Sequence, residues 1–172
     1  MNFNDLDGIK KAGFVGFRTV KELFADDSYV DNVKGIYLVL YLHSNPPEFL
    51  AVGSGPKLYK NKIDPNVSIE KLKLNWVKNV IVINIGKAGG KNNNGIETNA
   101  TLKSRLRQYV KFGNGKDVAH YGGKYIWQLK GSDGLIICWK KIPGGEPRAE
   151  EKKLIADFRL KYKVRPFANL KG

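Results

Sequence analysis

Two short runs of apolar, strand-forming residues limit what this chain can fold into more than any other feature. Residues 35–43 read GIYLVLYLH, and residues 79–85 read NVIVINI. Runs of this length, rich in β-branched and aromatic residues, favour buried strands over helices. Buried strands need a further layer of structure packed against each face of their sheet.

The remaining pattern supplies two more strands and two helices. These are predicted at residues 125–129 and 135–139 for the strands, and at 101–113 and 147–163 for the helices. Thr101 or Asn99 supplies a cap for the first helix, which ends at Gly113, and Pro147 opens the second. This succession of strands and helices predicts a small mixed α/β domain (α+β).

Three segments lie outside this pattern. Residues 1–33 are interpreted as an N-terminal helical extension, in which Thr19 and Glu22 fit a capping box. Residues 53–78 are interpreted as an inserted segment within a domain that spans residues 34–172. The polar, glycine-rich stretch GKAGGKNNNG, residues 86–95, is predicted to be an irregular loop.

The charge is concentrated in the second half of the chain. Of 30 basic and 16 acidic residues, residues 1–86 hold 11 and 9, whereas residues 87–172 hold 19 and 7. A one-sided positive field attracts polyanions and gains free energy when counterions leave phosphates. Nucleic acid is therefore the first partner to expect.

Composition excludes several other classes. A single cysteine, Cys138, excludes an internal disulfide and a cysteine-rich zinc site. His43 and His120 have no partner at a metal-binding spacing. No apolar run approaches the roughly 20 residues that span a bilayer, and the first residues have no apolar signal core. We therefore expect a cytoplasmic protein without membrane attachment.

Two charged residues lie on or beside apolar helix stripes. Glu151 shares a face with Leu154, Ile155 and Phe158, and Arg105 borders the stripe of its own helix. A carboxylate on an inward face is costly unless it is paired or binds a metal. The two side chains either form a buried ion pair or sit at a stripe's edge, or they belong to a site in which Glu151 holds a metal and Arg105 neutralises a phosphate.

Five motifs in the same order resemble the GIY-YIG nuclease superfamily. They are Gly35-Ile36-Tyr37, Ile85-Gly86-Lys87, LKSRLRQY at 102–109, EEKKLI at 150–155 and PFAN at 166–169. The resemblance covers about residues 34 to 170, and it implies a small mixed, largely antiparallel central sheet flanked by helices. The long loop after IGKAG is similar to the restriction-endonuclease-like and uncharacterised bacterial branches, which implies a restriction or defence setting.

The resemblance implies a hydrolase that cleaves DNA with one Mg²⁺ or Mn²⁺ ion. Tyr37 matches the tyrosine that acts as a general base or organises the attacking water, and Arg105 matches the arginine at the scissile phosphate. Glu151 matches the metal-binding carboxylate, and Asn169 matches an asparagine that supports the site. Tyr109 stands where relatives carry His or Tyr.

One position departs from the family pattern. The second motif normally begins with tyrosine, but here it reads Asn84-Ile85-Gly86. An amide cannot act as a base near neutral pH, although Lys87, a lysine that relatives often carry here, could compensate. The alternatives are therefore an active endonuclease, a weakened or inactive nucleic-acid-binding module, and a basic structural domain whose Arg105–Glu151 pair is an internal salt bridge.

The helix at 101–113 also carries a basic face. Lys103, Arg107 and Lys111 are four residues apart and are predicted to grip backbone phosphates away from the scissile one. The expected partner is DNA, with RNA left open, and a homodimer would allow both strands of a duplex to be cut.

Overall fold

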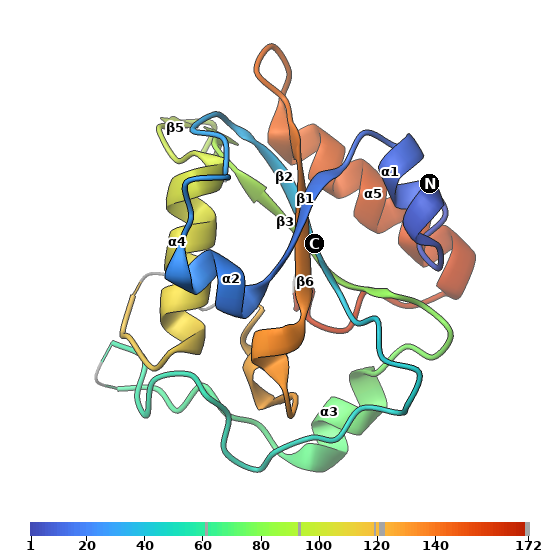
Figure 1. Ribbon diagram of the computed structural model, residues 1–172, viewed down its shortest axis with the longest axis vertical. Coiled ribbons are helices and arrows are strands. Elements are labelled where there is room, and N and C mark those ends of the chain that lie inside the picture. The colour runs from blue at the N-terminus through green and yellow to red at the C-terminus, as the bar shows by residue number, and fades with distance from the viewer. Residues whose placement is uncertain (61, 93, 119, 121–122, 171–172) are drawn as a thin grey trace.

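The computed structural model describes residues 1–60, 62–92, 94–118, 120 and 123–170 and is built around one four-stranded sheet (Figure 1). The strands of this sheet are β1 (Val15–Thr19), β2 (Gly35–Leu40), β3 (Val82–Ala88) and β6 (Ile136–Lys141). Their order is β1-β6-β2-β3, and each pairing is antiparallel. The strand β3 therefore forms one edge of the sheet.

Helices cover both faces of the sheet. The α-helices are α1 (Leu6–Lys11), α2 (Val20–Ala25), α3 (Ile69–Asn75), α4 (Leu102–Gly113) and α5 (Pro147–Tyr162), and the 3₁₀ turns are η1 (Lys124–Gln128) and η2 (Ser132–Gly134). In Figure 1, α2 and α4 lie on one side of the sheet, and α1 and α5 lie on the other. The α+β class and the antiparallel sheet expected from the sequence are confirmed.

The central strand β2 explains why two helical layers are needed. All six of its residues are buried, and successive side chains point to opposite faces of the sheet. Tyr37 and Val39 join the core beneath α2 and α4, whereas Ile36, Leu38 and Leu40 join the core beneath α1 and α5. The apolar run therefore places Tyr37 on the α4 face.

Local sequence signals fix the two longest helices. The Thr101 side chain accepts a hydrogen bond from Ser104 N, and the Ser104 side chain accepts one from Thr101 N, which completes a capping box at the start of α4. Glu146 caps α5 directly before Pro147, the first helical residue. Both predicted helices are confirmed within one or two residues.

Three expectations about the elements were wrong. Residues 1–33 are not purely helical, because Val15–Thr19 pairs with β6 as an edge strand. Residues 125–129 were predicted to be a strand, but Lys124–Gln128 forms a 3₁₀ turn whose apolar residues are buried without strand pairing. The stretch after β3 is not wholly irregular, because β4 (Gly90–Lys91) pairs with β5 (Glu97–Thr98) in a small hairpin.

The segment at 53–78 is tied to the main core. Its helix α3 buries Leu72, and Val67 N donates to the Gln128 side chain at 2.8 Å. Within the described ranges, the structure holds no helix both long enough and apolar enough to cross a membrane.

Candidate active site

A cavity of about 620 Å³ opens beside the edge strand β3, near the starts of α4 and α5. It is lined by most of the residues singled out from the sequence: Tyr37, Asn84, Lys87, Arg105, Glu151 and Asn169. These side chains come from β2, β3, both long helices and the C-terminal segment. Because β3 is an edge strand, helices from the two faces of the sheet can both reach it.

Gly86 in the second motif makes room for the Tyr37 ring. Tyr37 and Gly86 are directly paired across β2 and β3. A Cβ atom added at Gly86 would lie 2.3 Å from Tyr37 Cζ and 2.4 Å from its hydroxyl. The tyrosine ring therefore lies against the glycine, which explains why the position paired with Tyr37 on β3 carries no side chain.

The Tyr37 phenol is strongly influenced by burial. Burial raises the pKa of Tyr37 to about 12, whereas the Arg105 guanidinium lowers it by charge and by a hydrogen bond. With a pKa near 12, only about one molecule in 10⁵ carries the phenolate at pH 7. Tyr37 is therefore a neutral hydroxyl that binds and orients at neutral pH.

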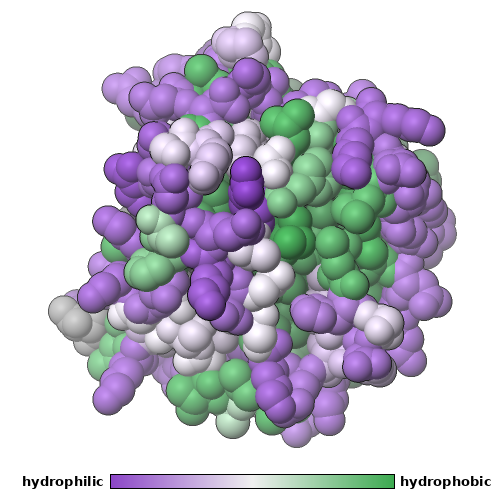
Figure 2. Space-filling view, viewed as in Figure 1, coloured by the Kyte–Doolittle hydropathy of each residue, from purple (hydrophilic) through white to green (hydrophobic). Residues whose placement is uncertain are grey.

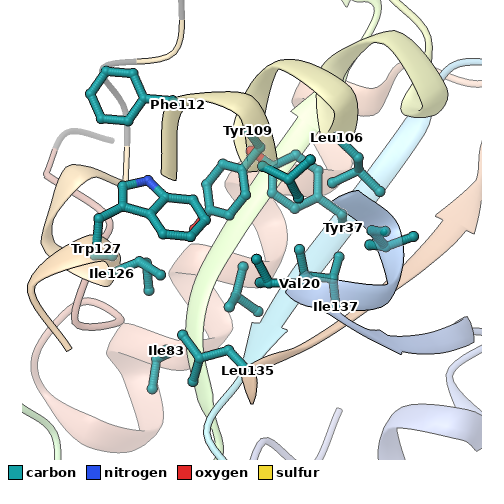
Figure 3. Packing of buried hydrophobic residues seen from close by; sticks show 14 of the residues in the cluster. Val20, Tyr37, Ile83, Leu106, Tyr109, Phe112, Ile126, Trp127, Leu135 and Ile137 are labelled. Carbon is teal, nitrogen blue, oxygen red and sulfur yellow. The ribbon is translucent and has the colours of Figure 1, made fainter. Parts of the chain in front are cut away.

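Tyr109 lies behind the cavity and does not line it. Its ring packs against Tyr37, with centroids 5.8 Å apart, and against Trp127 at 4.9 Å. Figure 3 shows these rings between α4 and the sheet. Asn84 Nδ2 approaches the Tyr109 hydroxyl at 3.5 Å. Asn84 is thus buried against a phenol that comes from α4.

Glu151 and Arg105 are brought together without forming a direct ion pair. Among the residues that the structure describes, none donates a hydrogen bond to the Glu151 carboxylate and none forms a salt bridge with it. Burial raises the pKa of Glu151, and Lys87, Arg105 and Arg148 oppose that rise through their charges. The simple buried Arg105–Glu151 pair is therefore not formed, and the carboxylate oxygens remain available at the cavity wall.

Lys87 points toward α5 and the hairpin loop. Its Nζ donates to Gly89 O at 2.9 Å and more weakly to Lys91 O at 3.5 Å. The Glu146 carboxylate, which caps α5, also accepts from Lys91 N, so the hairpin is fixed to the start of α5. This arrangement holds one positive charge near Glu151.

Asn169 completes the edge of the sheet. Ile85 N donates to Asn169 Oδ1 at 2.9 Å, and Asn169 Nδ2 donates to Ile85 O at 2.7 Å. Ala168 N also donates to Ile83 O. The side-chain amide imitates a neighbouring strand, satisfies the exposed edge of β3 and fixes that strand beside the cavity.

His120 lines the same cavity, although the sequence gave no reason to select it. It is buried, its ring packs edge-on against Tyr109 at 4.6 Å, and its Nδ1 has no hydrogen-bond partner among the described residues. Burial and the charge of Arg105 lower the pKa of His120 well below its usual value. A lone histidine in a loop carries no spacing signal, so only the tertiary structure identifies it.

The basic face of α4 lies away from the cavity. Arg107 Nε and Nη2 donate to both carboxylate oxygens of Asp27, and Lys103 Nζ lies 3.9 Å from the same carboxylate. Lys111 acts on Asp27 through its charge. These three residues therefore face a carboxylate near α2, and none lines the cavity.

The donor set limits the metal chemistry that the cavity can support. The described residues include no group of three or more histidine, cysteine, aspartate or glutamate side chains that could hold a metal. Glu151 is a hard oxygen donor, partly desolvated and without a described hydrogen-bond partner. This fits one divalent cation that keeps most of its water ligands, as Mg²⁺ commonly does.

Comparisons of the chain with protein-family models, with curated proteins and with solved structures find no match in any of the three.

Proposed function

We propose that this chain is a divalent-metal-dependent endonuclease that hydrolyses phosphodiester bonds of DNA, with a GIY-YIG-like architecture. The observation that carries the proposal is the single cavity that gathers Tyr37, Lys87, Arg105, Glu151 and Asn169. These residues were selected from separate motifs spread over more than 130 positions of the sequence. Their convergence beside one sheet edge supports a common chemical role.

The cavity suits the binding of a phosphodiester. Arg105 presents a planar guanidinium that can neutralise charge on the phosphate as the transition state forms. Lys87 adds a second positive charge, fixed by its bonds to the hairpin carbonyls. A Mg²⁺ or Mn²⁺ ion held by Glu151 would supply charge neutralisation and stabilise the leaving group.

Two neutral groups are placed to handle the attacking water. The Tyr37 hydroxyl, with its pKa near 12, can accept a hydrogen bond from water but is a poor acceptor of a full proton at pH 7. The imidazole of His120 is neutral at that pH, and its Nδ1 has no hydrogen-bond partner among the described residues. Because its lowered pKa disfavours protonation, we assign orientation of the water to Tyr37 and give His120 the role of a neutral hydrogen-bonding group in the cavity wall.

The test is metal-dependent cleavage of supercoiled plasmid DNA. Wild type should nick or cut with Mg²⁺ or Mn²⁺ and not in EDTA. Arg105→Ala should slow cleavage about a hundredfold or more, because it removes a charge aimed at the developing anion. Gln108→Ala, on the same helix but outside the cavity, is the control and should cut like wild type.

One observation favours a second candidate, a DNA-binding module with weak or lost catalysis. Asn84 stands where the resembled family carries its second phenol. Its amide lies 3.5 Å from the Tyr109 hydroxyl and cannot act as a base near neutral pH. In that case wild type would bind DNA in a salt-dependent way and leave the plasmid intact under all metal conditions.

A further inference from the structure

A second cavity of about 630 Å³ adjoins the candidate active site. Asn169 and Leu170 line both cavities, so the two cavities meet at the C-terminal segment. The second cavity, called the basic groove below, lies between α3, the last turns of α5 and the loop that follows. Its floor includes Trp76 and Tyr125.

The lining of the basic groove carries positive charge only. Its charged residues are Lys71, Lys124, Arg159, Lys163 and Arg165, and among the described residues no acidic side chain lines it. Lys71, Arg159 and Lys163 form no salt bridge with any described part of the chain. The positive charges of Lys71 on α3 and of Arg159 and Lys163 at the end of α5 repel one another, and an anion in the groove would offset that repulsion.

The face of α4 provides a contrast. There, Lys103 and Arg107 are already engaged by Asp27, so a phosphate would have to compete with a carboxylate. In the basic groove, Lys71, Arg159 and Lys163 have no carboxylate of a described residue within salt-bridge distance. On the face seen in Figure 2, hydrophilic residues cover most of the left and upper surface, while hydrophobic residues gather to the right of centre. Because hydrophilic surface is so extensive, positive charge by itself does not distinguish the basic groove. Its position next to the active-site cavity does.

We propose that the basic groove binds the sugar–phosphate backbone of the DNA strand that leaves the active-site cavity past Asn169. This rests on the proposed function, because the groove is assigned to the strand whose phosphate lies at Arg105. Lys71 and Arg159 contact phosphates on opposite walls, from α3 and α5. The groove sets affinity and the direction of the strand, and it carries no chemistry.

The test uses two double variants with the same change in charge on the same two helices. The groove variant is Lys71→Gln with Arg159→Gln, and the control is Lys73→Gln with Lys153→Gln, whose side chains are exposed outside the groove. Binding of a short fluorescein-labelled DNA duplex is measured by anisotropy from about 50 to 200 mM salt in EDTA. Thermal unfolding of both proteins checks that they fold.

The groove variant should bind DNA about tenfold more weakly than wild type. The magnitude of the slope of log K against log salt should fall by about two, roughly one for each lost phosphate contact. The control should keep the wild-type slope. Cleavage by the groove variant should show a raised KM with kcat within about twofold, as expected when uniform binding is lost. If the double variant unfolds, Lys71→Gln alone should lose about one from the slope.

Equal slopes of log K against log salt for the groove and control variants would overturn the proposed role of the groove. Metal-dependent cleavage by wild type would in that case still support the nuclease. Slope loss confined to the groove variant, in a wild type that never cuts, would support the groove and overturn the nuclease. Absence of salt-dependent DNA binding by wild type would overturn both.

Discussion

Replacing Gly86 with alanine should disturb both the stability and the chemistry of this protein. The added Cβ would lie 2.3 Å from Tyr37 Cζ, 2.4 Å from its hydroxyl and 2.7 Å from Cε1. Carbon atoms in contact prefer about 3.5 to 4.0 Å, so the overlap exceeds 1 Å. The ring cannot move aside easily, because it is only 3% exposed and packs against Tyr109.

The expected size follows from this geometry. Overpacking in a core costs about 1–3 kcal/mol, which for a domain of this length lowers Tm by roughly 2–12 °C. Displacing the Tyr37 hydroxyl by about 1 Å from the reacting groups can reduce cleavage by about a hundredfold. Thermal denaturation and plasmid cleavage measure the two effects separately.

The chain provides a matched control at another glycine. A Cβ at Gly144 would meet nothing within 4 Å, and Gly144 is not in the left-handed region, so Gly144→Ala should leave stability unchanged or slightly raised. A Gly86→Ala protein with the Tm and the cleavage rate of wild type would refute the close packing of Tyr37 on β3.

Two further changes test the charges. Glu151→Gln should abolish metal-dependent cleavage and keep DNA binding. It should also stabilise the fold at neutral pH, because burial raises the Glu151 pKa and thus disfavours its ionised form. The difference in stability from wild type should shrink as pH falls and Glu151 takes up a proton, and a variant less stable than wild type at pH 7 would contradict this account. The hydrogen bonds from Arg107 lower the pKa of Asp27 in the folded protein. The ionised carboxylate therefore stabilises the wild type above the unfolded-state pKa of Asp27, and this stability is lost as pH falls through the folded-state pKa. Asp27→Asn should remove this contribution. Urea unfolding between about pH 3 and 7 measures both effects. Because the Asp27 carboxylate is partly exposed, its effect should stay near 1 kcal/mol or below. If Asp27→Asn leaves the dependence of the unfolding free energy on pH unchanged at acid pH, that result would count against the ion pair.

The sequence predicted the elements whose signals are local. The apolar runs of β2 and β3 and the caps of α4 and α5 depend on neighbouring residues, so they could be recognised without knowing the fold. The same holds for Glu151 and Arg105, whose positions relative to apolar stripes placed them beside a buried surface.

Other features were missed because they depend on distant partners. The strand β1 has little apolar character, and its pairing relies on Trp139, whose ring lies against Gly16 where a Cβ would come within 2.3 Å. The apolar residues of η1 satisfied the strand pattern equally well, because burial alone does not tell a strand from a buried turn.

The site itself divides in the same way. The sequence alone determined which residues to propose for phosphate chemistry, namely Tyr37, Arg105, Glu151 and Asn169, because their motifs stand out in order along the chain. Only the tertiary structure decided which of the many lysines and arginines face a carboxylate and which line a groove, and that His120 reaches the cavity. A charge's neighbours are set by which helix faces meet across the sheet, and that long-range packing leaves no periodic trace in the sequence.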